Sequence, residues 1–379
     1  MMEKKMELYV HIPFCVRKCA YCDFLSFPAE RDVQRQYVDR LKKEIEKMGA
    51  GFRETAVLSV FVGGGTPSVL DSGWMTEILA CLRSNFNIEE TAEISMEANP
   101  GTVTRDKLED YRRAGINRLS FGLQSSDNRE LRALGRIHTW EEFLESYFLA
   151  RESGFENINV DLMSALPGQT VKSWTGTLEK VTDLDPEHIS AYSLILEEGT
   201  PFFERYGEGR GDGILPDEDE EREMYHRTKE ILGERGYERY EISNYARKGK
   251  ECRHNIGYWT GVPYLGLGLG ASSFIDGRRF RNDNDMASYL ISEPGKRFEE
   301  EILTVKDMEE EFFYVGLRLV QGVSLREFED RFSVSVREVY PGLMEKLVRE
   351  GAAVIENERF MLTDYGMDVS NYVMAEFLQ

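Results

Sequence analysis

Hydrophobic and polar positions follow one repeating pattern along about the first 200 residues. Short runs of β-branched and aromatic residues, typical of buried strands, are each followed by a longer amphipathic stretch, which is typical of a helix. This order predicts parallel strands joined by helices, and therefore an α/β fold. The six expected strands are Leu8–Ile12, Val57–Val62, Glu93–Glu97, Arg118–Gly122, Asn157–Leu162 and His188–Leu194.

Helix signals lie between these strands. Thr139, followed three residues later by Glu142, forms a capping box, and Phe143, Tyr147 and Ala150 then recur on one helix face. Six strands are two fewer than a closed βα barrel has, so a partial barrel is expected. The C-terminal ends of its strands should open into one shared mouth, where barrel enzymes carry their chemistry.

The pattern changes in the second half of the chain. The acidic run Asp217–Glu223 is interpreted as a solvated helix face, and a Gly- and aromatic-rich stretch follows at Tyr240–Phe274. The elements expected after Thr304 are helices at Ser324–Phe332 and Pro341–Glu350 and a hairpin at Ala353–Leu362. This order predicts a smaller, mainly helical, winged-helix-like domain. The expected division is a barrel over residues 1–237, a linker segment over 238–300 and the helical domain over 301–379.

The charge balance narrows the set of partners. The formal net charge is −21, which opposes a nucleic-acid surface even though many winged-helix modules bind DNA. No apolar run approaches the roughly 20 residues of a membrane helix. The first ten residues, MMEKKMELYV, lack the apolar stretch of a secretory signal. A cytoplasmic protein with no transmembrane segment and no nucleic-acid partner is expected.

Three of the five cysteines, Cys15, Cys19 and Cys22, lie directly after the first expected strand. Such clustering in a long chain indicates metal chemistry rather than a disulfide scaffold. A structural zinc or an ordinary [4Fe–4S] centre takes four protein ligands, whereas three cysteines leave one iron of a cluster open. S-adenosylmethionine can chelate that iron through its amino and carboxylate groups. A [4Fe–4S] cluster and S-adenosylmethionine are therefore the expected cofactors.

Two other interpretations of the cysteine loop stay open. One is a zinc site completed by a distant histidine or by Cys252, and the other is a set of surface thiols without metal. Cys81 falls among Ile78, Leu79 and Leu82 in an expected helix. It is interpreted as a small buried hydrophobe.

Glycines and polar residues follow the other expected strands. The second strand runs into Gly63-Gly64-Gly65-Thr66, where the missing Cβ atoms let a ligand approach main-chain N–H and C=O groups. Three polar residues end the next strands, and they suit hydrogen bonds from an ammonium or a ribose hydroxyl: Glu97, Gln124 and Asp161. Arg136 could pair with a carboxylate through its planar guanidinium.

These motifs together resemble a known superfamily. The segment Tyr9–Cys15, the CxxxCxxC spacing, the GGGTPS loop, Gly122-Leu-Gln124 and Asn159-Val-Asp161-Leu are similar to radical S-adenosylmethionine proteins of the HemN/HemW group. The resemblance covers nearly the whole chain and implies an open (β/α)6 barrel followed by a HemN-type C-terminal domain. It also implies cofactor contacts from Tyr9, Tyr21, Phe24, Gly64, Gly65, Thr66, Glu97, Gln124, Arg136 and Asp161, and a contact of Ile195 with the adenine.

Two features separate the branches of this group. The coproporphyrinogen dehydrogenases carry a further cysteine two residues after the third ligand and a longer N-terminal arm, whereas this chain has Phe24 there and an early first strand. The HNxxYW signature of HemW-like haem chaperones appears at His254–Trp259. In that group the histidine is associated with haem, so His254 is the expected haem residue, with Cys252 as a second contact. The other interpretation is that His254 and Trp259 only tie the linker to the barrel.

The resemblance implies a haem chaperone without coproporphyrinogen oxidase activity. Haem would be its cargo, haem-requiring proteins its acceptors, and a flavodoxin or ferredoxin its electron donor. Peripheral association with a membrane is left open. The alternative is an oxygen-independent coproporphyrinogen III dehydrogenase, or another radical enzyme that acts on porphyrins.

Overall fold

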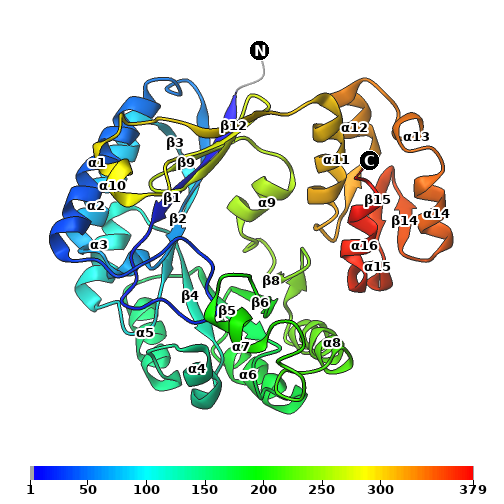
Figure 1. Ribbon diagram of the computed structural model, residues 1–379, viewed down its shortest axis with the longest axis horizontal. Coiled ribbons are helices and arrows are strands. Elements are labelled where there is room, and N and C mark those ends of the chain that lie inside the picture. Colours follow the sequence, from blue (N-terminus) through cyan, green and yellow to red (C-terminus); the bar gives the residue numbers. More distant parts are fainter. Residues whose placement is uncertain (1–3, 379) are drawn as a thin grey trace.

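A large curved sheet carries helices on its outer side, and a smaller C-terminal domain lies beside it (Figure 1). The computed structural model describes residues 4–378. Six parallel strands follow each other across the sheet in chain order, which confirms the expected α/β partial barrel. They are β1 (Lys5–Ile12), β2 (Ala56–Gly64), β3 (Asn87–Ala98), β4 (Arg118–Gln124), β5 (Ile158–Ser164) and β6 (His188–Ser193).

Helices connect the parallel strands and cover the outer face of the sheet. They are α1 (Arg31–Gly49), α2 (Ser72–Asn85), α3 (Arg105–Ala114), α4 (Asn128–Leu134), α5 (Trp140–Glu152) and α6 (Val171–Thr182), with a short 3-10 helix at Pro67–Val69. The capping box at the start of α5 is confirmed, because Thr139 and Glu142 each accept a hydrogen bond from the other's backbone. Phe143, Tyr147 and Ala150 are buried on one face of α5, as their spacing predicts.

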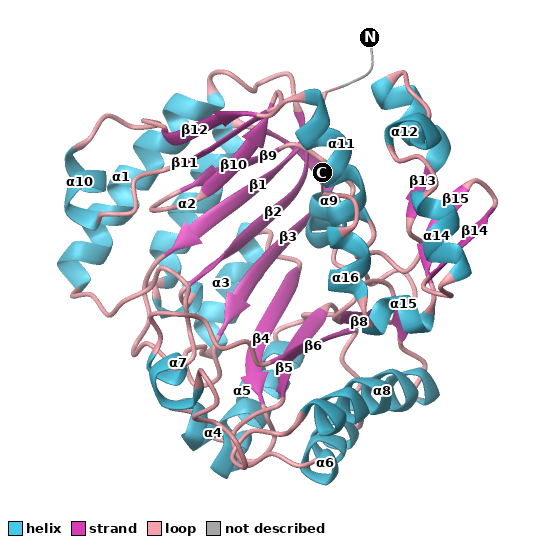
Figure 2. Cartoon of the chain, turned by 45° about the vertical axis from the view of Figure 1, so that its right-hand side comes forward, coloured by secondary structure: helices cyan, strands magenta, loops and turns pink. Residues whose placement is uncertain are grey.

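The sheet continues beyond the six parallel strands at both edges (Figure 2). On the β1 side lie β9 (Tyr264–Leu267), β10 (Ser272–Ile275), β11 (Arg278–Arg281) and β12 (Phe298–Ile302), and on the β6 side lie β8 (Asn244–Ala246) and β7 (Glu238–Arg239). β9 pairs parallel with β1, whereas β8 pairs antiparallel with β6. The segment expected to link the two domains therefore adds strands to the main sheet.

Four more helices lie in or near this segment: α7 (Pro201–Tyr206), α8 (Glu218–Glu234), α9 (Arg253–Trp259) and α10 (Met286–Ile291). The acidic run is confirmed as a mainly solvent-exposed part of α8, whose first turn is acidic and begins at a capping box on Asp217. Carboxylates in the first turn face the positive end of the helix dipole, which stabilises this helix start.

The C-terminal domain has a hydrophobic core of its own. Its elements are α11 (Val305–Gly316), β13 (Val323–Ser324), α12 (Leu325–Phe332), α13 (Val336–Val339), α14 (Leu343–Arg349), β14 (Ala353–Glu356), β15 (Arg359–Leu362), α15 (Asp364–Asp368) and α16 (Ser370–Ala375). Phe313 of α11 stacks on Phe377 with ring centroids 4.2 Å apart. The expected hairpin is confirmed as β14 and β15, and β13 completes a three-stranded sheet.

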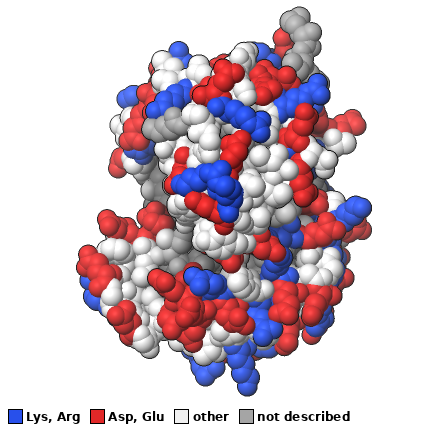
Figure 3. All heavy atoms as spheres, turned by 90° about the vertical axis from the view of Figure 1, so that its right-hand side faces the viewer, with Lys and Arg blue, Asp and Glu red and all other residues white. Residues whose placement is uncertain are grey.

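Acidic and basic side chains are interspersed over the face that includes the C-terminal domain (Figure 3). Such a mixture does not offer the continuous basic surface that binds phosphate backbones. Within residues 4–378, no helix combines the length and the apolar character needed to cross a membrane.

Candidate functional site

The three clustered cysteines lie on the loop that follows β1, and each side chain is half-buried. The loop is held at its start, where the N–H of Cys15 donates to the carbonyl of Phe27 at 3.1 Å and that of Phe27 donates to Pro13 at 2.9 Å. Within the loop, the N–H of Cys22 donates to the carbonyl of Cys19 at 3.3 Å. Main-chain bonds therefore fix the loop at the C-terminal end of the first strand.

A chain of side-chain contacts connects this loop with residues that follow β2, β3 and α4. Cys15 Sγ lies 3.4 Å from Thr66 Oγ1, which accepts a hydrogen bond of 2.7 Å from Asn99 Nδ2. Asn99 Oδ1 in turn accepts from the guanidinium of Arg136 at 2.7 Å, and Arg136 reaches Cys19 Sγ at 3.7 Å. The cysteines thus belong to the mouth of the barrel. Sequence reasoning missed Asn99, although its position directly after β3 and before Pro100 was a usable signal.

The donor set at this loop fits a [4Fe–4S] cluster. A cubane takes one thiolate for each ligated iron, so three cysteines on one loop hold three irons without converging on a single ion. Cys252 lies elsewhere, fully buried, with its Sγ 3.5 Å from Glu93 Oε1. Cys81 packs against the main core from α2. Among residues 4–378, no three His, Cys, Asp or Glu side chains are grouped closely enough to hold one metal ion.

The glycine loop after β2 brings main chain into the mouth. Gly64 has a φ of +112°, and a Cβ there would lie 2.4 Å from the His11 ring. A Cβ on Gly65 would lie 2.7 Å from the carbonyl oxygen of Phe14. Only glycine leaves room for this approach of backbone to backbone.

Two acidic side chains in the mouth, on β3 and β5, influence each other electrostatically. The N–H of Gly64 donates to Glu97 Oε2 at 3.0 Å. Burial and the nearby charge of Asp161 raise the pKa of Glu97 to about 8. Asp161 accepts hydrogen bonds from Ser120 at 2.9 Å and Asn159 at 2.8 Å. A buried carboxyl group of raised pKa suits a cationic partner, because an ammonium would restore its ionised form.

The remaining expected contacts surround these groups. Gln124 ends β4 with a φ of 74°. Tyr9 on β1 hydrogen-bonds His11 Nδ1 at 3.0 Å, and burial, together with the nearby charge of Glu97, raises the pKa of its phenol. Tyr21 lies on the cysteine loop between Cys19 and Cys22, and burial raises the pKa of its phenol. Phe24 and Ile195 are 68% and 69% exposed, so their apolar surfaces are free to cover a ligand.

Comparisons with known proteins agree on the family. Residues 9–181 match the Radical SAM superfamily, and residues 303–369 match the HemN C-terminal domain. The "Heme chaperone HemW" of Lactococcus lactis is 35% identical over 379 residues, which are all of this chain and 98% of that protein. The protein of the same name from Escherichia coli is 34% identical over 385 residues, covering 98% of both chains. The chain belongs to the HemW family.

A solved structure shows the same fold. The coproporphyrinogen III oxidase HemN from Escherichia coli, described as a radical SAM enzyme, superposes with a TM-score of 0.86. The superposition covers 99% of this chain and 90% of that one at 24% sequence identity. Both domains of this HemW-family chain therefore follow the architecture of HemN.

The motif histidine of this HemW-family chain is buried against β2 rather than exposed. His254 on α9 is 1% exposed, and its ring stacks on Phe61 with centroids 5.2 Å apart. Its Nδ1 lies 2.8 Å from Ser59 Oγ and its Nε2 lies 3.0 Å from the Tyr258 hydroxyl. Burial and the charge of Arg118 lower the pKa of His254 to about 3, so the imidazole is neutral. Both ring nitrogens are thus engaged inside the protein.

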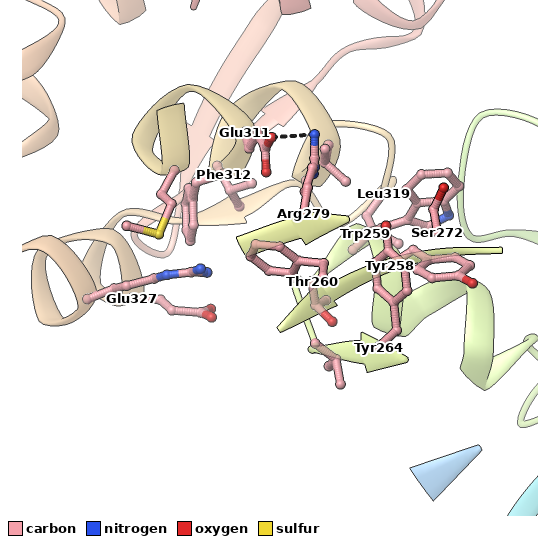
Figure 4. Close-up of a pocket in the computed structure, with 18 of the residues that line it drawn as sticks. Tyr258, Trp259, Thr260, Tyr264, Ser272, Arg279, Glu311, Phe312, Leu319 and Glu327 are labelled. Atoms are coloured by element: carbon pink, nitrogen blue, oxygen red, sulfur yellow. Dashed lines mark ion pairs between the residues drawn. The ribbon is translucent and has the colours of Figure 1, made fainter. Parts of the chain in front are cut away.

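Two other residues of the motif line a large cavity at the junction of the two domains. Tyr258 and Trp259 form part of its wall, and the cavity has a volume of about 610 Å³ (Figure 4). Tyr264 and Phe312 add aromatic surface, and the Arg279–Glu311 ion pair of 2.7 Å spans the two domains. The sequence pointed to His254, whereas the structure exposes its neighbours in the motif to this cavity.

Proposed function

We propose that this protein is a haem chaperone, which binds haem as cargo and delivers it to haem-requiring proteins. The observation that carries the proposal is the cavity between the two domains, which is walled by Tyr258 and Trp259 of the HNxxYW motif. The names of the HemW relatives support the same activity.

The chemistry of the cavity suits a flat, carboxylate-bearing macrocycle. Aromatic rings supply faces for a porphyrin, since large apolar ligands bind in mostly apolar cavities with few polar groups. Three arginines and two glutamates line the cavity of a chain whose net charge is −21. Arg331 makes no ion pair within residues 4–378, and Arg359 donates to the carbonyls of Gln321 and Gly322 at 2.7 Å. These guanidinium groups are suited to haem propionates.

The mouth of the barrel would hold the [4Fe–4S] cluster and S-adenosylmethionine. Cys15, Cys19 and Cys22 would ligate three irons, and the fourth iron would bind the amino and carboxylate groups of S-adenosylmethionine. A reduced cluster can supply one electron to the sulfonium. Around it, Glu97 would accept from the methionyl ammonium, and Ile195 would cover the adenine. The other contacts proposed are Tyr9, Tyr21, Phe24, Gly64, Gly65, Thr66, Gln124, Arg136 and Asp161.

The same proposal includes an electron donor, haem acceptors, a cellular location and a division into domains. A flavodoxin or ferredoxin would reduce the cluster, and haem-requiring proteins would receive the cargo in the cytoplasm. The proposed division into a barrel at 1–237, a linker segment at 238–300 and a C-terminal domain at 301–379 would place the haem cavity where the last two parts meet.

The competing activity is oxidative decarboxylation of coproporphyrinogen. Phe24 argues against it, because this exposed ring stands where the dehydrogenases have a further cysteine.

A single preparation of the protein can distinguish haem transfer from coproporphyrinogen decarboxylation. Full-length protein with its cluster restored anaerobically is titrated with hemin and then mixed with an apo b-type cytochrome.

We expect saturable hemin binding, the appearance of the holocytochrome spectrum, and no turnover of coproporphyrinogen with S-adenosylmethionine and reductant. Release of protoporphyrinogen would establish the dehydrogenase instead. Absence of hemin binding by the wild-type protein would overturn the chaperone proposal.

A further inference from the structure

The HNxxYW helix offers two polar side chains that could serve haem, and the structure separates their positions. His254 and Tyr258 are four residues apart on α9, so they lie on the same face of the helix. His254 is 1% exposed and does not line the cavity, whereas Tyr258 does. An iron atom in the cavity would therefore meet Tyr258 before it could meet His254.

The hydrogen bonds of His254 explain why the imidazole is not free to turn toward the cavity. Ser59 from β2 holds Nδ1 at 2.8 Å, and Tyr258 holds Nε2 at 3.0 Å. The ring is also stacked on Phe61, and Glu7 Oε2 lies 3.7 Å from Nδ1. Rotating the ring out would break its hydrogen bond with the buried Ser59 hydroxyl, which costs free energy.

Resting on the haem-chaperone function proposed above, we propose that the Tyr258 hydroxyl, not the His254 imidazole, is the axial ligand of ferric haem. His254 is then a positioning residue, which holds the phenol oxygen through its Nε2. Tyrosine is an established haem ligand in proteins, and metal ligands are commonly oriented by a second hydrogen-bonded group. In this proposal Tyr258 binds the iron, and His254 holds the Tyr258 hydroxyl in place.

The binding step balances in protons and electrons. The Tyr258 O–H bond breaks, a bond forms between the phenolate oxygen and ferric iron, and the proton is released to solvent through the cavity. His254 stays neutral, and its Nε2, 3.0 Å away, is placed to donate to the phenolate oxygen. Iron stays ferric, so no oxidant or reductant is needed.

Another histidine at the cavity wall is not available as a ligand in this structure. His11 donates from Nε2 to the carbonyl of Leu25 at 2.8 Å, and its Nδ1 accepts from Tyr9 at 3.0 Å. Tyr264 also lines the cavity, and its ring lies edge-on to that of Tyr258 with centroids 4.7 Å apart. Within residues 4–378, no hydrogen bond joins the Tyr264 hydroxyl to an imidazole. Tyr264 is therefore a matched control for Tyr258.

The test compares four full-length proteins with restored clusters: the wild type, Tyr258→Phe, His254→Gln and Tyr264→Phe. Each is titrated with hemin, and resonance Raman spectra of the ferric complexes report phenolate and imidazole ligation. The wild type should show iron–phenolate modes. Tyr258→Phe should lose these modes and bind hemin more weakly, whereas Tyr264→Phe should keep both. His254→Gln should keep shifted phenolate modes and lose about tenfold in affinity.

Cluster absorbance and circular dichroism identify any variant that fails to fold. Unchanged Raman spectra in Tyr258→Phe would overturn the proposal, as would imidazole-ligated haem in the wild type that disappears in His254→Gln. Failure of the wild type to bind hemin is a different outcome, because it would overturn the chaperone function itself.

Discussion

At the scale of single residues, one hydrogen-bonded chain organises the cysteine loop. Thr66 after β2, Asn99 after β3 and Arg136 after α4 connect Cys15 to Cys19. Two of these three side chains were identified from the sequence, Thr66 in the glycine loop and Arg136 as a partner for a carboxylate. Asn99 was missed although it directly follows a strand, because its importance comes from two partners, Thr66 and Arg136, that are distant along the chain.

Replacement of any one of Cys15, Cys19 and Cys22 by serine should abolish the [4Fe–4S] cluster. A serine hydroxyl is a poor substitute for the soft thiolate that iron–sulfur clusters need. Iron analysis and electron paramagnetic resonance of anaerobically reconstituted protein measure the loss. Cys81→Ser is the control, since Cys81 packs in α2 against the core, and it should retain the cluster. A full cluster in any of the three loop variants would contradict the assignment.

His138 should make the protein sensitive to acid. Burial and the charge of Arg136 lower its pKa from 6.5 to about 3. The unfolded chain therefore binds a proton near pH 6.5 that the folded protein takes up only near pH 3, so stability falls as the pH falls between these values. Relative to His138→Gln, the wild type should lose about 1.4 kcal/mol per pH unit below 6.5.

Denaturant unfolding of both proteins between pH 7.5 and pH 5 measures this slope. Above pH 7 their pH dependence should coincide, because the histidine is neutral in both states. Equal slopes below pH 6.5 would show that His138 does not stay neutral in the folded protein.

At the scale of secondary-structure elements, the buried parallel strands were predictable and the edge strands were not. Each of β1 to β6 contains several apolar residues and is separated from the next strand by a helix, so the local sequence carries its signal. The strands β9 to β11 have four residues each, and β10 pairs with β9 through a single residue pair. Such short elements become strands because a neighbouring edge is there to pair with them.

The glycine loop after β2 depends on the absence of a side chain at Gly64. Gly64→Ala should weaken S-adenosylmethionine binding and lower stability, because the new Cβ would lie 2.4 Å from the His11 ring. Gly101→Ala is the matched control. It also has a positive φ, of +78°, but its Cβ would meet nothing within 4 Å.

Calorimetric titration and denaturant unfolding separate the two effects. Gly101→Ala should lose only about 1–2 kcal/mol of stability, because its backbone becomes strained, and it should keep its affinity for S-adenosylmethionine. Gly64→Ala should lose more stability than this, together with affinity. Equal behaviour of the two variants would show that the space at Gly64 is not needed.

At the scale of the whole molecule, the two domains meet through a few specific contacts. Arg318 reaches Glu241 at 3.3 Å and lies over the Trp259 ring at 4.4 Å from its centroid. Main-chain hydrogen bonds run from Ile242 to Arg318 and from Val320 to Tyr240. The cavity wall at Trp259 is thus supported from the C-terminal domain.

Arg318→Met should destabilise this junction by about 1–3 kcal/mol, because it leaves the buried Glu241 carboxylate without its cation. Hemin affinity should fall as well, since Trp259 loses the guanidinium that packs on it. Denaturant unfolding and hemin titration measure both effects. Adding Glu241→Gln to Arg318→Met should recover part of the stability. Arg326→Met, which removes an exposed pair with Asp330, should change stability by less than about 0.5 kcal/mol.

The sequence by itself determined the βα order, the cysteine loop, the glycine loop and the acidic strand ends. These features are local, because each depends on spacing within a strand, a turn or a motif of a few residues. Only the tertiary structure decided that Cys252 lies away from the cysteine loop, that His254 is enclosed and that Tyr258 faces a cavity. The walls of that cavity come from β1, α9, α11 and β15, which are far apart along the chain. Which side of a short helix is buried depends on those partners, and no local pattern encodes them.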